Sequence, residues 1–63
     1  MPVVIVDMWA GRSQEQKKTI VKGITEAFTK VGTPADAVHI IINDVPKTNW
    51  ATGGKLASEE PTH

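Results

Sequence analysis

The strongest constraint in this sequence is a pair of short β-branched segments that are apolar on both of their faces. Pro2 to Met8 read PVVIVDM, and Val38 to Asn43 read VHIIIN. Successive side chains of a strand point to opposite faces, so each of these segments must be covered on both faces. We predict one strand over each range.

The segment between the two predicted strands is typical of one amphipathic helix, which we place at about Ser13 to Val31. Ser13 and Gln16 have the spacing of a capping box. Gly32, followed by Pro34, marks the end of the helix. The predicted apolar stripe contains Ile20, Ile24, Ala27, Phe28 and Val31.

The order strand, helix, strand predicts a βαβ unit, in which the two strands run parallel. The segment from Pro46 to Ala57 is irregular except for Gly53-Gly54, a pair that favours the turn of a short hairpin. The predicted fold class is therefore α+β, with a parallel βαβ unit followed by a short C-terminal hairpin.

The length of the chain, 63 residues, indicates a single domain over residues 1–63. A domain of this size buries only about 60% of the surface of its unfolded chain. Small domains are commonly stabilised by disulfides, a metal or oligomerisation. The chain has no cysteine, its only histidines are His39 and His63, and its carboxylates show no ligand spacing. We therefore expect no metal, and we expect self-association to cover the second strand face.

The charge pattern excludes several kinds of partner. Seven basic and seven acidic residues leave no net charge, and no basic run is interleaved with aromatic residues, so we expect no nucleic-acid partner. The longest apolar run is far shorter than the roughly 20 residues of a membrane helix, so we expect no membrane partner. No signal peptide is recognisable, and a cytoplasmic location is the default expectation.

Pro2 is the first candidate for a catalytic group. An initiator methionine before a small residue such as proline is normally removed, which leaves a secondary amine at the start of the first strand. An α-amino group has a reference pKa of about 7.7–8.0, and desolvation or a nearby cation lowers that value. A neutral amine of this kind can act as a general base. Taken alone, Pro2 also fits the commoner case of a proline that only starts a strand.

Arg12 and Trp50 are candidates for substrate binding. The guanidinium of Arg12 can hold a carboxylate through two parallel hydrogen bonds, close to the donors of the predicted helix start. A solvated surface arginine fits equally. Trp9 and Trp50 are two of only three aromatic residues. Trp50 lies in a polar segment that we do not expect to bury it, so it fits a subunit interface or a pocket wall.

We expect His39 to be central in the second apolar strand, which is buried, so that its side chain points into a core or into a site. A lone histidine in such a strand is more often a structural residue than a catalyst. Asp7 and Asp44 lie near the predicted strand ends, where carboxylates more often form caps or ion pairs than act as acids.

Taken together, these features resemble those of the 4-oxalocrotonate tautomerases. A Met-Pro start opens an apolar strand, and Gly11-Arg12-Ser13 precedes a single helix. Trp50 is then followed by Gly53-Gly54 and by Leu56-Ala57-Ser58. The resemblance covers nearly the whole chain and its short length.

The resemblance implies a homohexamer, built as a trimer of dimers, and a proton-shuttling amino-terminal proline. Pro2 would take the hydroxyl proton of a dienol such as 2-hydroxymuconate and return it at carbon. Arg12 would hold the distal carboxylate, and Trp50 would wall the pocket and keep its local dielectric low. No metal or organic cofactor is implied.

His39 departs from the pattern of this family. Well-studied members carry a second arginine in the second strand, which comes from a neighbouring subunit and binds the 2-oxo and carboxylate end of the substrate. Aligning Val38-His39-Ile40 with that strand places His39 at this position. A histidine has no bidentate fork, and the loss of one charge-assisted contact costs roughly 1.5–3 kcal/mol. His39 is therefore a substrate-binding candidate, and we expect it to bind a carboxylate less tightly than an arginine at this position would.

The sequence thus predicts an isomerase that interconverts enol and keto forms of small unsaturated 2-oxo acids, with a pocket at a subunit interface. Two alternatives stay open. One is a proline-dependent dehalogenase or decarboxylase of unsaturated acids, which would need a carboxylate near Pro2 to activate water. The other is a non-catalytic oligomeric binding protein of the same fold.

Overall fold

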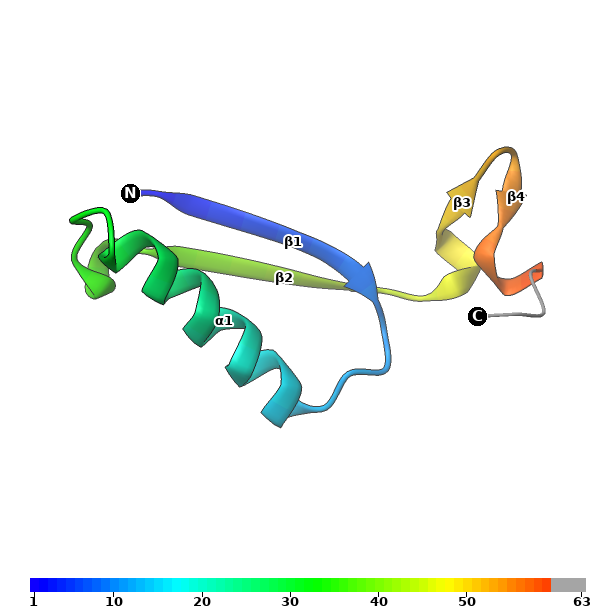
Figure 1. Ribbon diagram of the computed structural model, residues 1–63. Coiled ribbons are helices and arrows are strands. Elements are labelled where there is room, and N and C mark those ends of the chain that lie inside the picture. Colours follow the sequence, from blue (N-terminus) through cyan, green and yellow to red (C-terminus); the bar gives the residue numbers. More distant parts are fainter. Residues whose placement is uncertain (60–63) are drawn as a thin grey trace.

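The computed structural model describes residues 1–59 and contains a βαβ unit followed by a hairpin (Figure 1). The site candidates lie within this range, and His63 lies outside it. The strands are β1 (Val3–Trp9), β2 (His39–Val45), β3 (Ala51–Thr52) and β4 (Lys55–Leu56), and the helix is α1 (Gln14–Thr29). Single 3-10 turns follow α1, β2 and β4, at Ala35–Ala37, Lys47–Asn49 and Ala57–Glu59.

Strands β1 and β2 form a parallel pair, as predicted. Their register runs from Val3 opposite His39 to Trp9 opposite Val45. The short strands β3 and β4 pair antiparallel. Gly53 and Gly54 form their turn with φ values of 62° and 80°, a backbone region that glycine adopts readily. The predicted fold class, a parallel βαβ unit with a C-terminal hairpin, is confirmed.

Both strands differ by one or two residues from the predicted bounds. Strand β1 begins after Pro2 and continues to Trp9, whereas β2 begins at His39 and continues to Val45. The polar side chains at the predicted end of β2 do not stop the strand because they have partners. The amide of Asn43 donates to the Asp7 carboxylate at 2.8 Å, and Asp44 forms an ion pair with Lys17 of α1.

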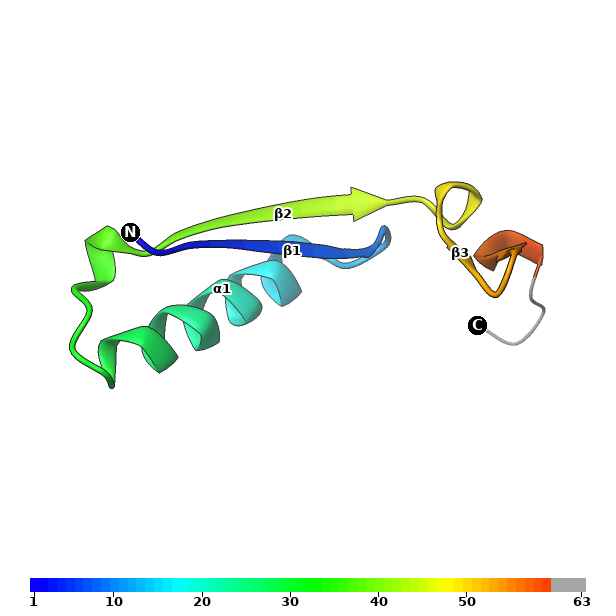
Figure 2. The same ribbon diagram turned by 90° about the horizontal axis from the view of Figure 1, so that it is seen from above.

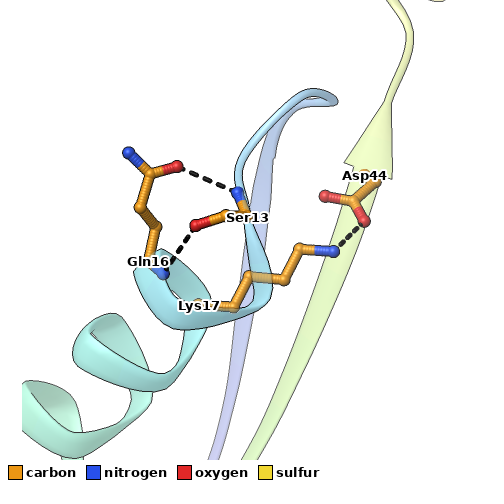
Figure 3. A network of polar contacts seen from close by, with 4 residues as sticks. All are labelled: Ser13, Gln16, Lys17 and Asp44. Carbon is orange, nitrogen blue, oxygen red and sulfur yellow. Dashed lines mark hydrogen bonds and ion pairs between the residues drawn. The ribbon is translucent and has the colours of Figure 1, made fainter.

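Helix α1 begins at the predicted capping box (Figure 3). The Ser13 hydroxyl accepts from the Gln16 amide at 3.1 Å, and the Gln16 side chain accepts from the Ser13 amide at 2.9 Å. The helix ends at Thr29, two residues before the predicted end. The amides of Val31 and Thr33 both donate to the Phe28 carbonyl, which closes the helix early. Val31 is therefore 78% exposed and lies outside the apolar stripe. The prediction that placed Val31 in this stripe is wrong.

Helix α1 lies over one face of the β1–β2 pair and leaves the other face open (Figure 2). The ion pair between Lys17 and Asp44 marks the face toward α1. The half-buried side chains on this side are Val4, Val6, Met8, Ile40 and Ile42 from the strands, and Ile20, Val21, Ile24, Thr25 and Phe28 from the helix. Val21 and Thr25 are half-buried, whereas Ala27 and Val31, which were expected in the stripe, are exposed. The buried side of the helix is therefore rotated slightly from the predicted one.

The opposite face of the β1–β2 pair, which we call the open face, carries apolar side chains in contact with solvent. Ile5 is 63% exposed, Ile41 is 49% exposed and Val3 is 44% exposed. Among residues 1–59, only Ala57 is buried. One chain therefore covers only one of the two apolar strand faces, as the sequence predicts.

Candidate active site

Pro2 and Arg12 lie at opposite ends of β1. Pro2 directly precedes the strand, and Arg12 follows it in the loop to α1 (Figure 1). The seven residues of β1 span about 20 Å at the usual rise per residue. The Pro2 and Arg12 of one chain therefore cannot contact the same small substrate.

Pro2 and His39 are brought together at the amino ends of β1 and β2. The His39 amide donates to the Pro2 carbonyl at 2.9 Å. The Met1 amino group extends the same edge and donates to the Ala37 carbonyl at 2.9 Å. In a chain that retains Met1, the Pro2 nitrogen is a tertiary amide and has no basic lone pair.

The position of His39 corrects one prediction. His39 is the first residue of β2, not a central one, and its side chain is exposed on the open face, beside Val3. The strand begins late because the 3-10 turn Ala35–Ala37 extends to its start and the Val38 amide still donates to the Ala35 carbonyl. His39 thus lies on an accessible surface next to Pro2 rather than in a core.

Arg12 is exposed at the start of α1. Gly11 has a φ of 121°, which lets the chain turn sharply between β1 and the capping box. Arg12 is the residue directly before the helix cap Ser13. A guanidinium at this place can bind an anion next to the free amides of the first helical turn.

Trp50 has a partner within its own chain, contrary to the expectation that its segment could not cover it. The rings of Trp9 and Trp50 meet edge to face, with centroids 6.0 Å apart and an interplanar angle of 75°. The ammonium of Lys47 lies 4.7 Å from the centre of the Trp9 ring. These three half-buried side chains, which we call the indole cluster, lie at the carboxyl ends of β1 and β2.

The sequence reasoning missed Lys47 as a candidate site residue. Its ring contact depends on Trp9 and on the turn after β2, and neither residue spacing nor composition indicated it. Trp9 itself was conspicuous only as a rare aromatic residue.

The two strand carboxylates have structural partners. Asp7 accepts the hydrogen bond from Asn43, and Asp44 pairs with Lys17. Asp7 is five residues along the strand from Pro2, about 16 Å away at the usual rise. This geometry gives the Pro2 of the same chain no carboxylate from either strand.

Two other kinds of site are not found in the part of the chain that the structure describes. Within residues 1–59, no three histidine or carboxylate side chains gather closely enough to hold a metal ion. No helix in the same range is both long and apolar enough to cross a membrane.

Comparison with known proteins agrees with this fold. A relative from Lactiplantibacillus plantarum, named a probable tautomerase, is 46% identical over 61 residues, which is 95% of each chain. The 2-hydroxymuconate tautomerase of Comamonas testosteroni is 43% identical over 60 residues, which is 94% of this chain and 95% of the relative.

A solved structure gives the same result. A 4-oxalocrotonate tautomerase isozyme from Methylibium petroleiphilum superimposes with a TM-score of 0.85 at 38% identity. The match covers 90% of this chain and 94% of the isozyme. The family model for tautomerase enzymes matches residues 2–60. The chain therefore belongs to the tautomerase family.

Proposed function

We propose that this tautomerase interconverts the enol and keto forms of small unsaturated 2-oxo acids, with the free amine of Pro2 as general base. The observation that carries the proposal is the family match, which begins at Pro2 itself and includes a 2-hydroxymuconate tautomerase among the relatives. The position of Pro2 at the start of β1, beside the first residue of β2, supports it.

The proposed reaction is a proton transfer that needs only one base. After removal of Met1, the neutral secondary amine of Pro2 takes the proton from the 2-hydroxyl group of the dienol. The conjugated double bonds shift, and the Pro2 ammonium returns the proton to a carbon of the substrate chain. The product is the conjugated ketone, and the amine is regenerated.

Arg12 and Trp50 have supporting roles in this proposal. Arg12 binds the distal carboxylate and draws electron density along the conjugated chain, which stabilises the charge that develops in the transition state. Trp50 forms a wall of the pocket and excludes water, so that the Pro2 amine stays uncharged and basic.

The proposed site is shared between copies of the chain. Pro2 and Arg12 lie at opposite ends of β1, which spans about 20 Å, so a substrate that contacts both must lie between subunits. The exposed apolar side chains of the open face support self-association. We propose a homohexamer, arranged as a trimer of dimers, as the complete enzyme. A cytoplasmic location stays a prediction.

His39 is proposed as a weak substrate-binding residue. Its imidazole is exposed on the open face, from which a neighbouring subunit can present it to the substrate, and it can donate one hydrogen bond to the oxygen at the 2-position. It lacks the fork of a guanidinium, so it holds a neighbouring carboxylate less firmly. The enzyme therefore selects its substrate less strongly by the carboxylate at the 2-oxo end than it would with an arginine at position 39.

A comparison of two substrates tests the proposal against its enzymatic alternative. The purified protein is assayed for ketonisation of 2-hydroxymuconate and for dehalogenation of 3-chloroacrylate. We expect ketonisation to be the faster reaction by orders of magnitude, because the matched family and the named relatives are tautomerases. Dehalogenation without ketonisation would favour the proline-dependent hydrolytic enzymes, and inactivity on both would favour a binding protein of the same fold.

A further inference from the structure

The indole cluster is held in place by the ends of both parallel strands. Trp9 is the last residue of β1 and pairs with Val45, the last residue of β2. The Ala10 amide donates to the Val45 carbonyl at 3.0 Å, which ties the chain after β1 to the end of β2. Lys47 follows two residues later and places its ammonium on the Trp9 ring.

The turn that carries Lys47 also fixes Trp50. The Asn49 amide donates to the Pro46 carbonyl at 2.8 Å, and the Trp50 amide donates to the Lys47 carbonyl at 3.4 Å. The Trp50 carbonyl in turn accepts from the Ala57 amide at 2.7 Å. The flexible side chain of Lys47 is therefore attached to a short, hydrogen-bonded turn and is steadied at its far end by the Trp9 ring.

The combination of groups in the indole cluster fits one class of ligand. The indole ring of Trp50 offers an apolar, polarisable wall for a planar conjugated chain. An ammonium next to that wall offers a positive charge for a carboxylate at the end of the chain, in a place where the rings reduce its hydration. An unsaturated dicarboxylate has both parts, whereas the corresponding monocarboxylate lacks the second charge.

We propose that Lys47 is a specificity-determining residue that contacts a carboxylate of the substrate and that Trp9 is the positioning residue that holds Lys47 there. This inference rests on the proposed function, since it assigns the indole cluster to the same pocket as Trp50. It predicts that Lys47 raises the affinity for substrates that carry a second carboxylate. Lys47 supplies a second cation, besides Arg12, in a chain that has a histidine at position 39.

The inference is tested by equilibrium binding, which does not depend on turnover. Muconate and sorbate are unreactive six-carbon dienoates that differ in the second carboxylate. Calorimetric titration of the assembled protein is expected to show that Lys47→Gln weakens muconate binding about tenfold and sorbate binding less than twofold, as for the loss of one charge-assisted contact. Lys47→Arg should bind muconate within about threefold of the unmodified protein.

Matched variants separate contact from structure. Lys55→Gln removes a charge from the exposed hairpin strand β4 and should leave both affinities unchanged. Trp9→Leu removes the ring beneath Lys47 and should weaken muconate binding as Lys47→Gln does, with no further loss in the double variant. Trp9→Phe keeps a ring face beneath Lys47 and should retain most of the affinity for muconate. It replaces Trp9→Leu as the test of the ring contact if Trp9→Leu fails to assemble.

The outcomes distinguish this inference from the proposed function. If Lys47→Gln weakened muconate and sorbate binding equally, the inference would be wrong even in an active tautomerase. It would be equally wrong if Lys47→Gln changed the binding of neither ligand. Failure of the unmodified protein to bind muconate more tightly than sorbate would also overturn it. If the protein showed the expected Lys47-dependent preference for muconate but did not ketonise 2-hydroxymuconate, the proposed reaction would fail and the dicarboxylate contact would stand.

Discussion

The amide of His39 donates a hydrogen bond of 2.9 Å to the carbonyl of Pro2, so the two residues lie side by side at the amino ends of β1 and β2. This bond fixes the strand from which the proposed catalytic amine emerges. The His39 imidazole is exposed on the open face, the face through which we propose that the chain associates. In the assembled enzyme, residue 39 should therefore affect how the 2-oxo end of the substrate is held.

Replacement of His39 by arginine tests this relationship. His39→Arg adds a bidentate cation at the proposed 2-oxo and carboxylate end of the site, so the KM for 2-hydroxymuconate should fall about tenfold while kcat changes little. Steady-state kinetics on 2-hydroxymuconate measures the effect, with His39→Gln as the uncharged control. An unchanged or higher KM in the arginine variant would show that residue 39 does not face the carboxylate.

Mixed oligomers test the sharing of the site between chains. Pro2→Ala and Arg12→Ala should each be nearly inactive as pure proteins. The two variants are unfolded together and reassembled in equal amounts, so that chains combine at random at equivalent interfaces. About a quarter of the sites then contain both an intact Pro2 from one chain and an intact Arg12 from another. The kcat per site should recover accordingly. No recovery in assembled mixtures would mean that one chain supplies both groups.

A charge on the open face should disrupt assembly. Ile5 is 63% exposed in a single chain, and burial of such a side chain contributes about 1.5–3 kcal/mol at an interface. Ile5→Asp replaces this gain with the cost of burying a carboxylate, so sedimentation should show a shift to smaller species. Lys22→Asp, on the exposed side of α1, is the control and should assemble normally. Normal assembly of Ile5→Asp would place the interface elsewhere.

The capping box should contribute measurably to stability. Ser13→Ala removes the hydroxyl that accepts from the Gln16 amide and leaves that amide without its cap. The free energy of unfolding should fall by about 1 kcal/mol per chain, as measured by urea denaturation at constant protein concentration. Ser58→Ala, at an exposed position of the 3-10 turn Ala57–Glu59, is a control that should change stability little. Equal stability of both variants would contradict this role of Ser13.

Local signals in the sequence were sufficient for much of the fold. The capping box of Ser13 and Gln16, the two β-branched segments and the Gly53-Gly54 turn each depend on neighbouring residues, and all appear where expected. The strand ends were less predictable, since Asn43 and Asp44 remain in β2 through contacts with Asp7 and Lys17, residues distant in sequence.

The candidate site was predictable only in part, because its geometry depends on tertiary contacts. Pro2 and Arg12 were identified from the family pattern, but their separation along β1 follows from the seven-residue length of the strand. The exposure of His39 depends on the turn before β2. The contact of Lys47 with Trp9 joins residues that are 38 positions apart, and no local signal reports such a pair.

The most direct test of the account is the ketonisation rate of Pro2→Ala relative to the unmodified protein, with intact mass measured on both. The unmodified protein should lack Met1 and should ketonise 2-hydroxymuconate. Pro2→Ala should assemble normally and lose at least about a hundredfold in kcat, the scale of general base catalysis. Full activity in assembled Pro2→Ala, or in protein whose mass shows that Met1 is retained, would contradict a catalytic role for the Pro2 amine.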